Sequence, residues 1–600
     1  MKKTIILAGC IFLSLALNAQ DICGVTHSGH QTRQRTFPIE NYKELDNPVK
    51  TDAGLWKNVK GIKVSWGSTD IRYKKEVPAM KGKDMSRNVT AWKGERVSSQ
   101  FVVWGSNGIN NLNFTVSDLK GKGDNKIGKN NVFAGFVRYV MTDELNEDKR
   151  GGCGYRHDLS KFDSTLVADP IDHLTKDIKL ERMTSQGCWV RVDVPRNTPT
   201  GSYSGKVIVK DGDKVISTLI LNIKVSERVL PEPQQRRFHL DLWQNPFAVA
   251  RYHQVGPWSE EHMKALKPYM ELYRDAGGKV ITTSIIHKPW NGQTHDPFTS
   301  MVNWIKKIDG SWEFDYTIFD RWVEFMIDLG IDKQINCYSM VPWKLSFNYF
   351  DEASNITRTI DAKPGEKAYE ELWTTMLQSF SKHLREKGWF DKTYISMDER
   401  PMDVMLETIK VIRKSDPEFK ISLAGALHEE LIDELDDYCV ALRMKYTDEM
   451  LAKRKAEGKT TTFYTSCEEP FPNTFTFAAP ADAEWFGWYA AKANLDGYLR
   501  WALNSWVLEP LLDSRFHTWA AGDTYLIYPG GRTSIRFERL NEGIQAYEKI
   551  NILRDEYKNN TKALKDIETA LEVIDENSLD KTTSAEEIDK AKRILRDLGF

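Results

Sequence analysis

The chain has 600 residues, of which 41% are hydrophobic and 28% charged. This composition is typical of folded globular proteins and excludes collagen-like, low-complexity and multi-span membrane chains. The 83 basic and 85 acidic side chains leave a net charge of −2, so no basic excess predicts a nucleic-acid or acidic-lipid partner. The length accommodates two or three domains.

The first 20 residues have the pattern of an export signal. Two lysines precede an apolar run from Ile5 to Leu17, and the small residues that follow resemble a cleavage site. We therefore expect a signal peptide over 1–20 and an exported protein, either periplasmic or at the cell surface. The segment ending at Cys10 resembles a lipoprotein signal, but the apolar run continues beyond it. No later stretch approaches the ~20 apolar residues that span a bilayer.

Residues 21–232 are expected to form a β-sandwich domain. Between about Thr51 and Val225 the hydrophobic residues alternate with a period of two, as Val190, Val192 and Val194 do, which is typical of half-buried strands. The dipeptide at 211–212 is Asp-Gly, which predicts a hairpin turn between two alternating runs. The proline-rich stretch at 230–233 then predicts a stiff connection to the next domain.

Residues 233–555 are expected to form a (β/α)₈ TIM barrel. Short β-rich runs alternate with amphipathic helical stretches, and eight strands are predicted: Phe238–Trp243, Lys279–Ile286, Gln334–Met340, Thr393–Asp398, Lys420–Ala424, Cys439–Met444, Thr461–Thr465 and Gly497–Trp501. A doubly wound sheet is the alternative, but no GxGxxG fingerprint follows a strand. The polar, charged segment 556–600 predicts a short C-terminal helical appendage on the surface. The fold class is thus multidomain, β followed by α/β.

Six cysteines follow the signal segment and are widely scattered. No CxxC pair, HExxH motif or Cys/His cluster has the spacing of zinc ligands, so we expect neither a metal nor a cofactor. An exported protein can form disulfides. Cys153 and Cys188 belong to the same predicted domain and are therefore the expected pair.

Two adjacent carboxylates, Asp398 and Glu399, follow the fourth predicted barrel strand. Active sites of such barrels lie at the carboxyl ends of the strands. Neighbouring side chains of a regular strand face opposite ways, so both acids can reach one substrate only if the chain leaves strand geometry here. Arg400-Pro401 makes such a break plausible. The competing interpretation is a helix N-terminus, where acidic side chains complement the helix dipole.

The adjacency of the two acids favours one type of glycosidase mechanism. Two opposed carboxylates must lie several ångströms apart across a sugar, whereas substrate-assisted enzymes need one proton donor and a second group that serves the sugar's own 2-acetamido nucleophile. In that scheme Glu399 is the general acid/base. Asp398 accepts the amide N–H and stabilises the positive oxazolinium that forms.

Aromatic side chains follow most of the predicted barrel strands. Sugars stack their apolar faces on such rings, and amide or carboxylate groups hydrogen-bond their hydroxyls. The aromatic candidates are Trp243, Trp290, Tyr338, Trp343, Tyr464, Trp501 and Trp506, and the polar candidates are Asn473, Asn504 and Asp523. Core packing is the alternative for each residue taken singly. Together they predict a carbohydrate-binding cleft.

Six blocks of sequence, in order, resemble glycoside hydrolase family 123. They are Leu240–Pro246, Cys337–Trp343, Met397–Pro401, Pro472–Phe475, Gly497–Trp501 and Ala521–Tyr525. The resemblance implies an exo-acting, retaining β-N-acetylgalactosaminidase with a sandwich ahead of its barrel, which removes terminal β-linked N-acetylgalactosamine from glycans, including those of glycosphingolipids. It also implies that Asp398 orients the acetamido group and that Glu399 is the acid/base.

Three questions stay open at this point. By similarity to other substrate-assisted hexosaminidases, a tyrosine should donate to the acetamido carbonyl; Tyr464 is the preferred candidate and Tyr446 its rival. A different enzyme would use Glu399 as the acid and Glu468 or Glu469 as a carboxylate nucleophile. A protein without activity would bind glycans on a degenerate barrel, but the presence of both Asp398 and Glu399 argues against degeneracy.

Overall fold

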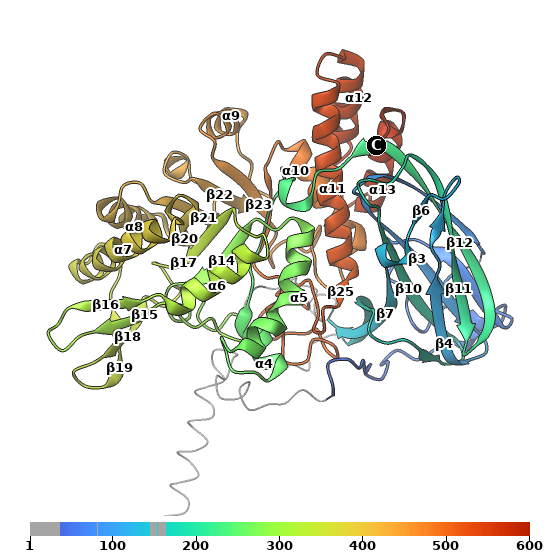
Figure 1. Ribbon diagram of the computed structural model, residues 1–600, viewed down its shortest axis with the longest axis horizontal. Helices are drawn as coiled ribbons and strands as arrows, with labels where there is room; N and C mark the ends of the chain where they lie inside the picture. The colour runs from blue at the N-terminus through green and yellow to red at the C-terminus, as the bar shows by residue number, and fades with distance from the viewer. Residues whose placement is uncertain (1–36, 81, 144–152, 154–163) are drawn as a thin grey trace, which may run out of the picture.

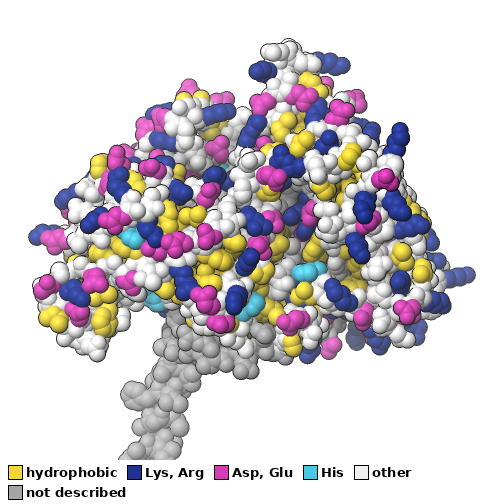
Figure 2. All heavy atoms as spheres, viewed as in Figure 1, with side chains coloured by type: hydrophobic (Ala, Val, Ile, Leu, Met, Phe, Trp, Pro, Cys, Tyr) yellow, Lys and Arg dark blue, Asp and Glu magenta, His cyan; other side chains and the backbone are white. Residues whose placement is uncertain are grey.

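The computed structural model describes residues 37–80, 82–143, 153 and 164–600. The expected export signal, with Cys10, lies outside the described residues. Figure 1 shows a β-sandwich, a parallel barrel beside it and a group of C-terminal helices between the two. Among the described helices, none combines the length and the apolar character needed to cross a bilayer. Figure 2 shows acidic and basic side chains interspersed over the barrel and the helices, in keeping with the balanced net charge.

The N-terminal domain is the expected sandwich of two sheets, preceded by the short helix α3 (Ala53–Trp56). The first sheet has the order β1 (Ile62–Gly67), β3 (Arg96–Gly105), β10 (Thr184–Asp193), β7 (Val132–Thr142), β8 (Thr165–Asp172) and β25 (Thr533–Ser534). The second has the order β2 (Ser86–Lys93), β12 (Lys214–Val229), β11 (Gly201–Asp211), β4 (Ile109–Val116) and β9 (Ile178–Leu180), with β5 (Leu119–Lys120) and β6 (Lys126–Ile127) beside it.

The period-two pattern behaves differently on the two sheets. In β11 and β12 one face is buried and the other is not, and the strands join at the predicted Asp-Gly turn, where Gly212 adopts a φ of 57°. In β10 both faces are buried, because its outer face is covered by a helix from the C-terminal part of the chain. The guanidinium of Arg191 on that face donates to Glu538 of the helix at 2.9 Å.

All eight predicted barrel strands are present, and they pair in parallel around the barrel. They are β13 (His239–Leu242), β14 (Val280–Ser284), β17 (Gln334–Tyr338), β20 (Thr393–Met397), β21 (Lys420–Gly425), β22 (Asp437–Ala441), β23 (Thr460–Tyr464) and β24 (Gly497–Arg500). A bridge between Leu240 and Gly278 joins the first strand to the start of the second. The barrel is therefore nearly closed, and its strand ends converge on one mouth.

The helices at 260–276, 317–328, 367–387 and 402–415 bury one face each, as their sequence pattern predicts, whereas the helix at 480–492 and most of the helix at 535–556 are buried on all sides. These six and two further helices pack around the barrel. They are α4 (Pro246–His253), α5 (Glu260–Ala276), α6 (Thr317–Asp328), α7 (Lys367–Lys387), α8 (Met402–Ser415), α9 (Asp448–Ala456), α10 (Pro480–Lys492) and α11 (Ile535–Glu556). In α5 the buried face includes Leu266, Tyr269 and Tyr273, and the left-handed Gly277 ends the helix. The regular alternation fails after β21, where only a single 3₁₀ turn, Glu429–Leu431, follows the strand.

A small sheet, not expected from the sequence, projects from the barrel beside its mouth (Figure 1). Its strands are β15 (Asn303–Lys306), β16 (Trp312–Asp315), β18 (Ser346–Asp351) and β19 (Ile356–Asp361), in the order β16-β15-β18-β19. Two of them come from the connection after β14 and two from the connection after β17. Both connections leave the carboxyl ends of barrel strands, so this sheet extends the face of the barrel at which the strands end.

The C-terminal helices pack more deeply than the expected surface appendage. Helix α11 contacts α10 of the barrel and β3 and β8 of the sandwich, and Figure 1 shows it standing between the two domains. Helices α12 (Thr561–Glu572) and α13 (Ser584–Leu595) follow it. Ile588 and Leu595 of α13 are buried in the main core, and the indole N–H of Trp485 donates to Glu587 at 2.8 Å.

Buried ion pairs fix the sandwich to the barrel. Asp169 of β8 accepts hydrogen bonds from Arg72 at 2.9 Å, Arg536 at 3.0 Å and Tyr528 at 2.6 Å. Burial alone would raise the pKa of Asp169, but the two guanidinium groups hold it below its usual value. A buried charge is tolerated when it is fully paired in this way. The sandwich is thus a fixed neighbour of the barrel mouth.

Candidate active site

The chain leaves strand geometry at the two adjacent acids, as the sequence predicts. Strand β20 ends at Met397, Glu399 lies in a bend, and Pro401 occupies the N-cap position of α8. No side chain caps the N-terminus of α8. Both acids therefore precede a helix N-terminus without a side-chain hydrogen bond to it, and both carboxylates line one cavity at the mouth of the barrel.

Asp398 is half-buried and held by two donors. The indole N–H of Trp343 donates to Oδ2 at 3.3 Å, and the backbone N–H of Glu399 donates to Oδ1 at 2.9 Å. Burial, followed by the nearby charge of Glu399, raises the pKa of Asp398 to about 6, while the two hydrogen bonds oppose the rise. Asp398 is consequently ionised at neutral pH and loses its charge in mild acid.

Trp343 owes its position to Arg400. The guanidinium of Arg400 lies 4.2 Å from the centre of the Trp343 ring, and its Nε donates to the carbonyl of Val341 at 2.8 Å. Such a cation–π contact restrains an exposed ring; the Trp343 residue is 44% exposed. One face of this indole is therefore occupied by Arg400, and its N–H points at the carboxylate of Asp398.

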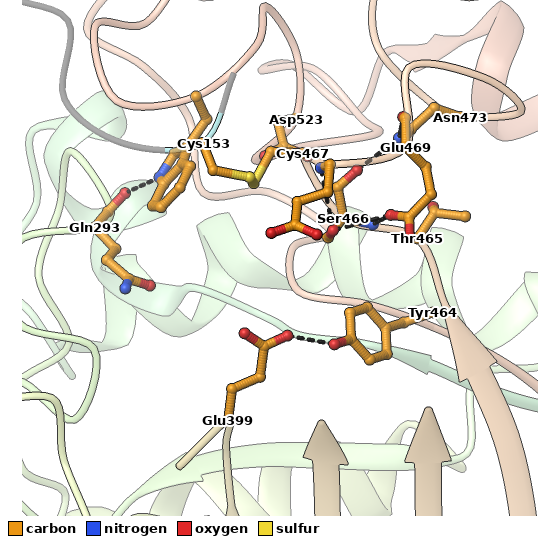
Figure 3. The surroundings of a disulfide bond; sticks show 12 residues. Cys153, Gln293, Glu399, Tyr464, Thr465, Ser466, Cys467, Glu469, Asn473 and Asp523 are labelled. Carbon is orange, nitrogen blue, oxygen red and sulfur yellow. Dashed lines mark hydrogen bonds between the residues drawn. A yellow bond between two sulfur atoms is a disulfide. The ribbon is translucent and has the colours of Figure 1, made fainter. Parts of the chain in front are cut away.

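Glu399 is paired with a tyrosine from across the barrel mouth. The hydroxyl of Tyr464, the last residue of β23, donates to Oε1 of Glu399, as Figure 3 shows. Burial and the charge of Glu399 raise the pKa of Tyr464, so this phenol stays protonated and remains a donor. The rival Tyr446 lies elsewhere, because its hydroxyl donates to the carbonyl of Tyr438 at 2.8 Å.

The cavity holds about one sugar ring. Its volume is about 240 Å³, below the roughly 300 Å³ at which pockets for drug-sized ligands begin. Five of the seven aromatic candidates line it: Trp243, Trp290, Trp343, Tyr464 and Trp501. Trp243 and Trp290 pack against each other with ring centres 4.8 Å apart. Apolar rings beside two carboxylates suit a sugar, because a sugar stacks one apolar face on the rings and hydrogen-bonds the carboxylates through its hydroxyls.

The other two aromatic candidates lie behind the cavity. Tyr338 is buried against Trp243, with ring centres 4.6 Å apart. The indole N–H of Trp506 donates to the carbonyl of Ile527 at 2.8 Å, and its ring packs against Tyr269. Both residues serve as packing.

Asn473 and Asp523 also lie behind the cavity wall, not in the cavity where the sequence places them. Asn473 donates to the carbonyls of Ser466 and Glu469 at 2.8 and 2.6 Å. Arg500, which is fully buried, donates to Asn473 at 2.7 Å and also to Asp523. A buried guanidinium requires such partners. Asn473 therefore holds the loop after β23, and Asp523 is a partner of the buried Arg500. Asn504 is likewise buried, and it bonds Asn245.

Of the two candidate nucleophiles, one reaches the cavity. Glu468 lines it and pairs with Arg443. Glu469 is buried and accepts hydrogen bonds from the backbone N–H and the hydroxyl of Ser466 at 2.8 and 2.9 Å. Glu469 therefore stabilises the loop.

Several cavity residues are not evident from the sequence. Gln293, Trp519 and Arg443 come from three different connections after barrel strands. The predicted sixth strand extends to Met444, whereas β22 ends at Ala441. Arg443 was therefore assigned to the strand itself and not to the connection that follows it. The indole N–H of Trp519 donates to the carbonyl of Gln293 at 2.8 Å. Trp519 belongs to a long connection without regular structure, for which the sequence carries no positional signal.

The expected disulfide pair is wrong. Cys153 bonds Cys467, not Cys188. Cys188 lies on β10 inside the sandwich core, where burial also raises the pKa of its thiol. Cys153 instead reaches the barrel, and both bonded cysteines line the cavity opposite Glu399 and Tyr464 (Figure 3).

A larger cavity of about 510 Å³ lies between the sandwich and helices α11 and α13. Charged side chains of both signs line it, and several of them form ion pairs with one another. Arg539 forms ion pairs with Asp70, Glu484 and Glu542. This cavity is remote from the strand ends of the barrel, so the smaller cavity is the candidate active site.

Comparison with known proteins identifies the family of both domains. Residues 243–553 match the catalytic-domain model of glycoside hydrolase family 123, and residues 66–211 match the N-terminal-domain model of the same family. A family 123 glycoside hydrolase from Clostridium perfringens, described in connection with glycolipid glycan hydrolysis, is 29% identical with a TM-score of 0.80. That match covers 90% of this chain and 98% of the other. No curated protein matches the sequence significantly.

Two other solved structures are more distant. A family 39 glycoside hydrolase from Bacteroides cellulosilyticus is 12% identical with a TM-score of 0.32, over 71% of this chain and 81% of the other. A Bacteroides ovatus xyloglucanase is 9% identical with a TM-score of 0.29, over 80% and 100%. Neither carries any part of the argument.

The matches to glycoside hydrolase family 123 define an enzyme that hydrolyses glycosidic bonds. The chain belongs to glycoside hydrolase family 123, as the six sequence blocks imply.

Proposed function

We propose that this enzyme removes terminal β-linked N-acetylgalactosamine from glycans, with retention of anomeric configuration and with the substrate's acetamido group as nucleophile. The observation that carries the proposal is the position of Asp398 and Glu399. They are neighbours in the chain and line one cavity of about 240 Å³. That arrangement supplies one proton donor and one acetamido partner on the same side of a single sugar ring.

In the first step the acetamido carbonyl oxygen attacks the anomeric carbon and the glycosidic bond breaks. Glu399 gives its proton to the departing oxygen, and Asp398 accepts the amide N–H while its negative charge stabilises the oxazolinium. In the second step a water molecule gives a proton to Glu399 and its oxygen attacks the anomeric carbon. The oxazolinium ring opens and the acetamido group is restored. The anomeric carbon is inverted in each step, so its configuration is retained overall.

Tyr464 and Asp398 have the protonation states that this scheme needs. The raised pKa of Tyr464 keeps its hydroxyl a donor, available to the acetamido carbonyl oxygen next to Glu399. The pKa of about 6 at Asp398 leaves it ionised at neutral pH. An ionised group beside a developing positive charge is worth far more in an enclosed cavity than in water.

The choice of substrate class rests on similarity. The Clostridium perfringens structure is described in terms of glycolipid glycan hydrolysis, and the six sequence blocks resemble β-N-acetylgalactosaminidases. Paired nitrophenyl β-N-acetylgalactosaminide and β-N-acetylglucosaminide test it. We expect the galacto substrate to be cleaved at least tenfold faster in kcat/KM; equal rates would replace the proposal with a general hexosaminidase.

A second mechanism is kept because Glu468 lines the same cavity. In it Glu468 attacks the anomeric carbon directly. Glu468 is paired with Arg443, and its position in the cavity wall is compatible with this role. Glu468→Gln distinguishes the two schemes. If Glu468 is the nucleophile, the variant should lose essentially all turnover; if Glu468 only lines the cavity, the variant should retain most of it.

We also propose that the protein is exported. The lysine-led apolar segment at the N-terminus supports this, and so does a disulfide, since these bonds persist in oxidising compartments. Fractionation of cells followed by N-terminal sequencing tests it; an uncleaved cytosolic chain would contradict it.

A further inference from the structure

The disulfide between Cys153 and Cys467 joins the sandwich to the wall of the catalytic cavity. Cys467 is three residues beyond Tyr464 in the loop after β23, and Cys153 belongs to the connection between β7 and β8 of the sandwich. Both cysteines line the cavity that holds Asp398 and Glu399. In Figure 3 the bond faces the Glu399–Tyr464 pair across the cavity.

The loop after β23 is held firmly on the side away from the cavity. Arg500 donates to the carbonyl of Thr465 at 2.9 Å and to Asn473 at 2.7 Å. Asn473 in turn donates to the carbonyls of Ser466 and Glu469. These contacts restrain the two ends of the loop. Cys467 and Glu468 lie between them, on the cavity side.

The sandwich strand that leads to Cys153 is itself anchored on the barrel. The backbone N–H of Met141 in β7 donates to the carbonyl of Leu512 at 2.9 Å. The hydroxyl of Thr142 is hydrogen-bonded to that of Thr476 at 2.8 Å, deep in the interface. The end of β7 is therefore fixed on the barrel. The disulfide joins the cavity side of the loop to a cysteine that follows this strand in the chain.

We propose that the Cys153–Cys467 disulfide is a positioning element of the catalytic cavity, which restrains the part of the sugar-binding wall that carries Cys467. It holds the segment 466–468 against the ring-binding space, beside Tyr464 and the Arg443–Glu468 pair. The inference rests on the proposed function for its kinetic consequence, but its structural consequence is independent of any substrate. A displacement of about 1 Å in such a wall can cost up to about 100-fold in rate.

The test begins with the folded, oxidised enzyme, so that folding is not at issue. Dithiothreitol supplies two electrons and two protons, the S–S bond breaks to two thiols, and the reagent closes to its own cyclic disulfide. Labelling with iodoacetamide and mass spectrometry verify that Cys153 and Cys467 have become thiols. Two readouts follow: kinetic constants on an aryl β-N-acetylgalactosaminide, and hydrogen exchange of the segment 465–472 in the oxidised and reduced enzyme.

We expect reduction to raise KM about tenfold while kcat changes less than threefold, and to speed exchange in 465–472 but not in β20. Reoxidation should restore both. The double variant Cys153→Ser/Cys467→Ser should behave like the reduced enzyme and should not respond to dithiothreitol. If the disulfide only stabilised the fold, its reduction would lower the melting temperature and leave KM unchanged.

Freed thiols with unchanged KM and unchanged exchange would overturn the inference. If the oxidised enzyme cleaves no 2-acetamido glycoside, the proposed function fails instead, and the exchange measurement still decides the role of the disulfide.

Discussion

The hydroxyl of Tyr464, at the end of β23, donates a hydrogen bond to the carboxylate of Glu399, just past the end of β20. Strands β21 and β22 separate these two in the barrel, so the bond crosses the barrel mouth. It places the proposed acid/base and the proposed acetamido donor in direct contact. A sugar bound there would offer Tyr464 a second acceptor beside Glu399.

Tyr464→Phe removes this donor and keeps the ring. We expect kcat to fall about 10²- to 10³-fold, the usual loss when one donor to a developing charge is removed. Tyr446→Phe is the matched control, because the Tyr446 hydroxyl bonds a backbone carbonyl outside the cavity, and its kcat should stay within about twofold of wild type. Similar losses in the two variants would remove Tyr464 from the mechanism.

Glu399→Gln should separate substrates by their leaving groups. A natural glycoside needs its departing oxygen protonated, which contributes about 10²- to 10⁴-fold, whereas nitrophenol leaves without a proton. The variant should therefore lose far more activity on a natural glycan than on the aryl glycoside. Asp398→Asn should slow both substrates alike. Equal losses on both substrates in Glu399→Gln would contradict its role as acid.

The pKa of Asp398 predicts an acidic limb in the rate profile. Since the proposed mechanism needs Asp398 as an anion and its pKa is raised to about 6, kcat/KM should fall as the pH drops through about 6. The residual activity of Asp398→Asn should lack this limb. A wild-type profile flat between pH 5 and 7 would show that ionised Asp398 is not required.

The same shift predicts an effect on stability. A carboxylate whose pKa is raised from 3.8 to about 6 on folding destabilises the folded state above pH 4, and the effect is complete above pH 6. Each unit of pKa is worth about 1.4 kcal/mol, so Asp398→Asn should stabilise the protein by up to about 3 kcal/mol at pH 7 and by nothing near pH 4. Thermal unfolding at the two pH values measures it; a variant less stable than wild type at pH 7 would contradict it.

Trp343→Phe tests the donor that faces Asp398. The ring and its stacking on Arg400 remain, but the N–H that donates to Oδ2 is lost. Because that bond lowers the pKa of Asp398, its removal should move the acidic limb to higher pH and reduce kcat several-fold. Trp501→Phe is the control, since it alters another aromatic residue of the cavity wall. The acidic limb of its pH–rate profile should stay at the wild-type pH.

The positions of the strand ends could be predicted from the sequence because two strong regularities apply. Parallel strands alternate with amphipathic helices, and barrel sites lie where the strands end. Asp398, Glu399 and Tyr464 each lie at or just past such an end, so their meeting at one mouth follows from topology. The break in the chain at Glu399 was evident from the proline that follows it.

The sequence did not predict the direction in which side chains point after a strand, or the contacts made by long connections. Asn473 and Asp523 also follow strands, but the buried guanidinium of Arg500 turns both away from the cavity. A charged residue in an otherwise apolar strand is the signal that such partners must exist nearby. The partner of Cys467 lies 314 residues earlier in the chain, and no pattern in the sequence indicates a pairing over such a separation.

The most direct test of the central claim compares nitrophenyl β-N-acetylgalactosaminide with nitrophenyl β-galactoside, which differ at the 2-position alone. Substrate assistance predicts turnover of the first, inhibition of that turnover by a galacto-configured thiazoline that mimics the oxazoline, and no turnover of the second. Comparable hydrolysis of the galactoside, unaffected by the thiazoline, would show that a carboxylate of the enzyme is the nucleophile and would contradict the account.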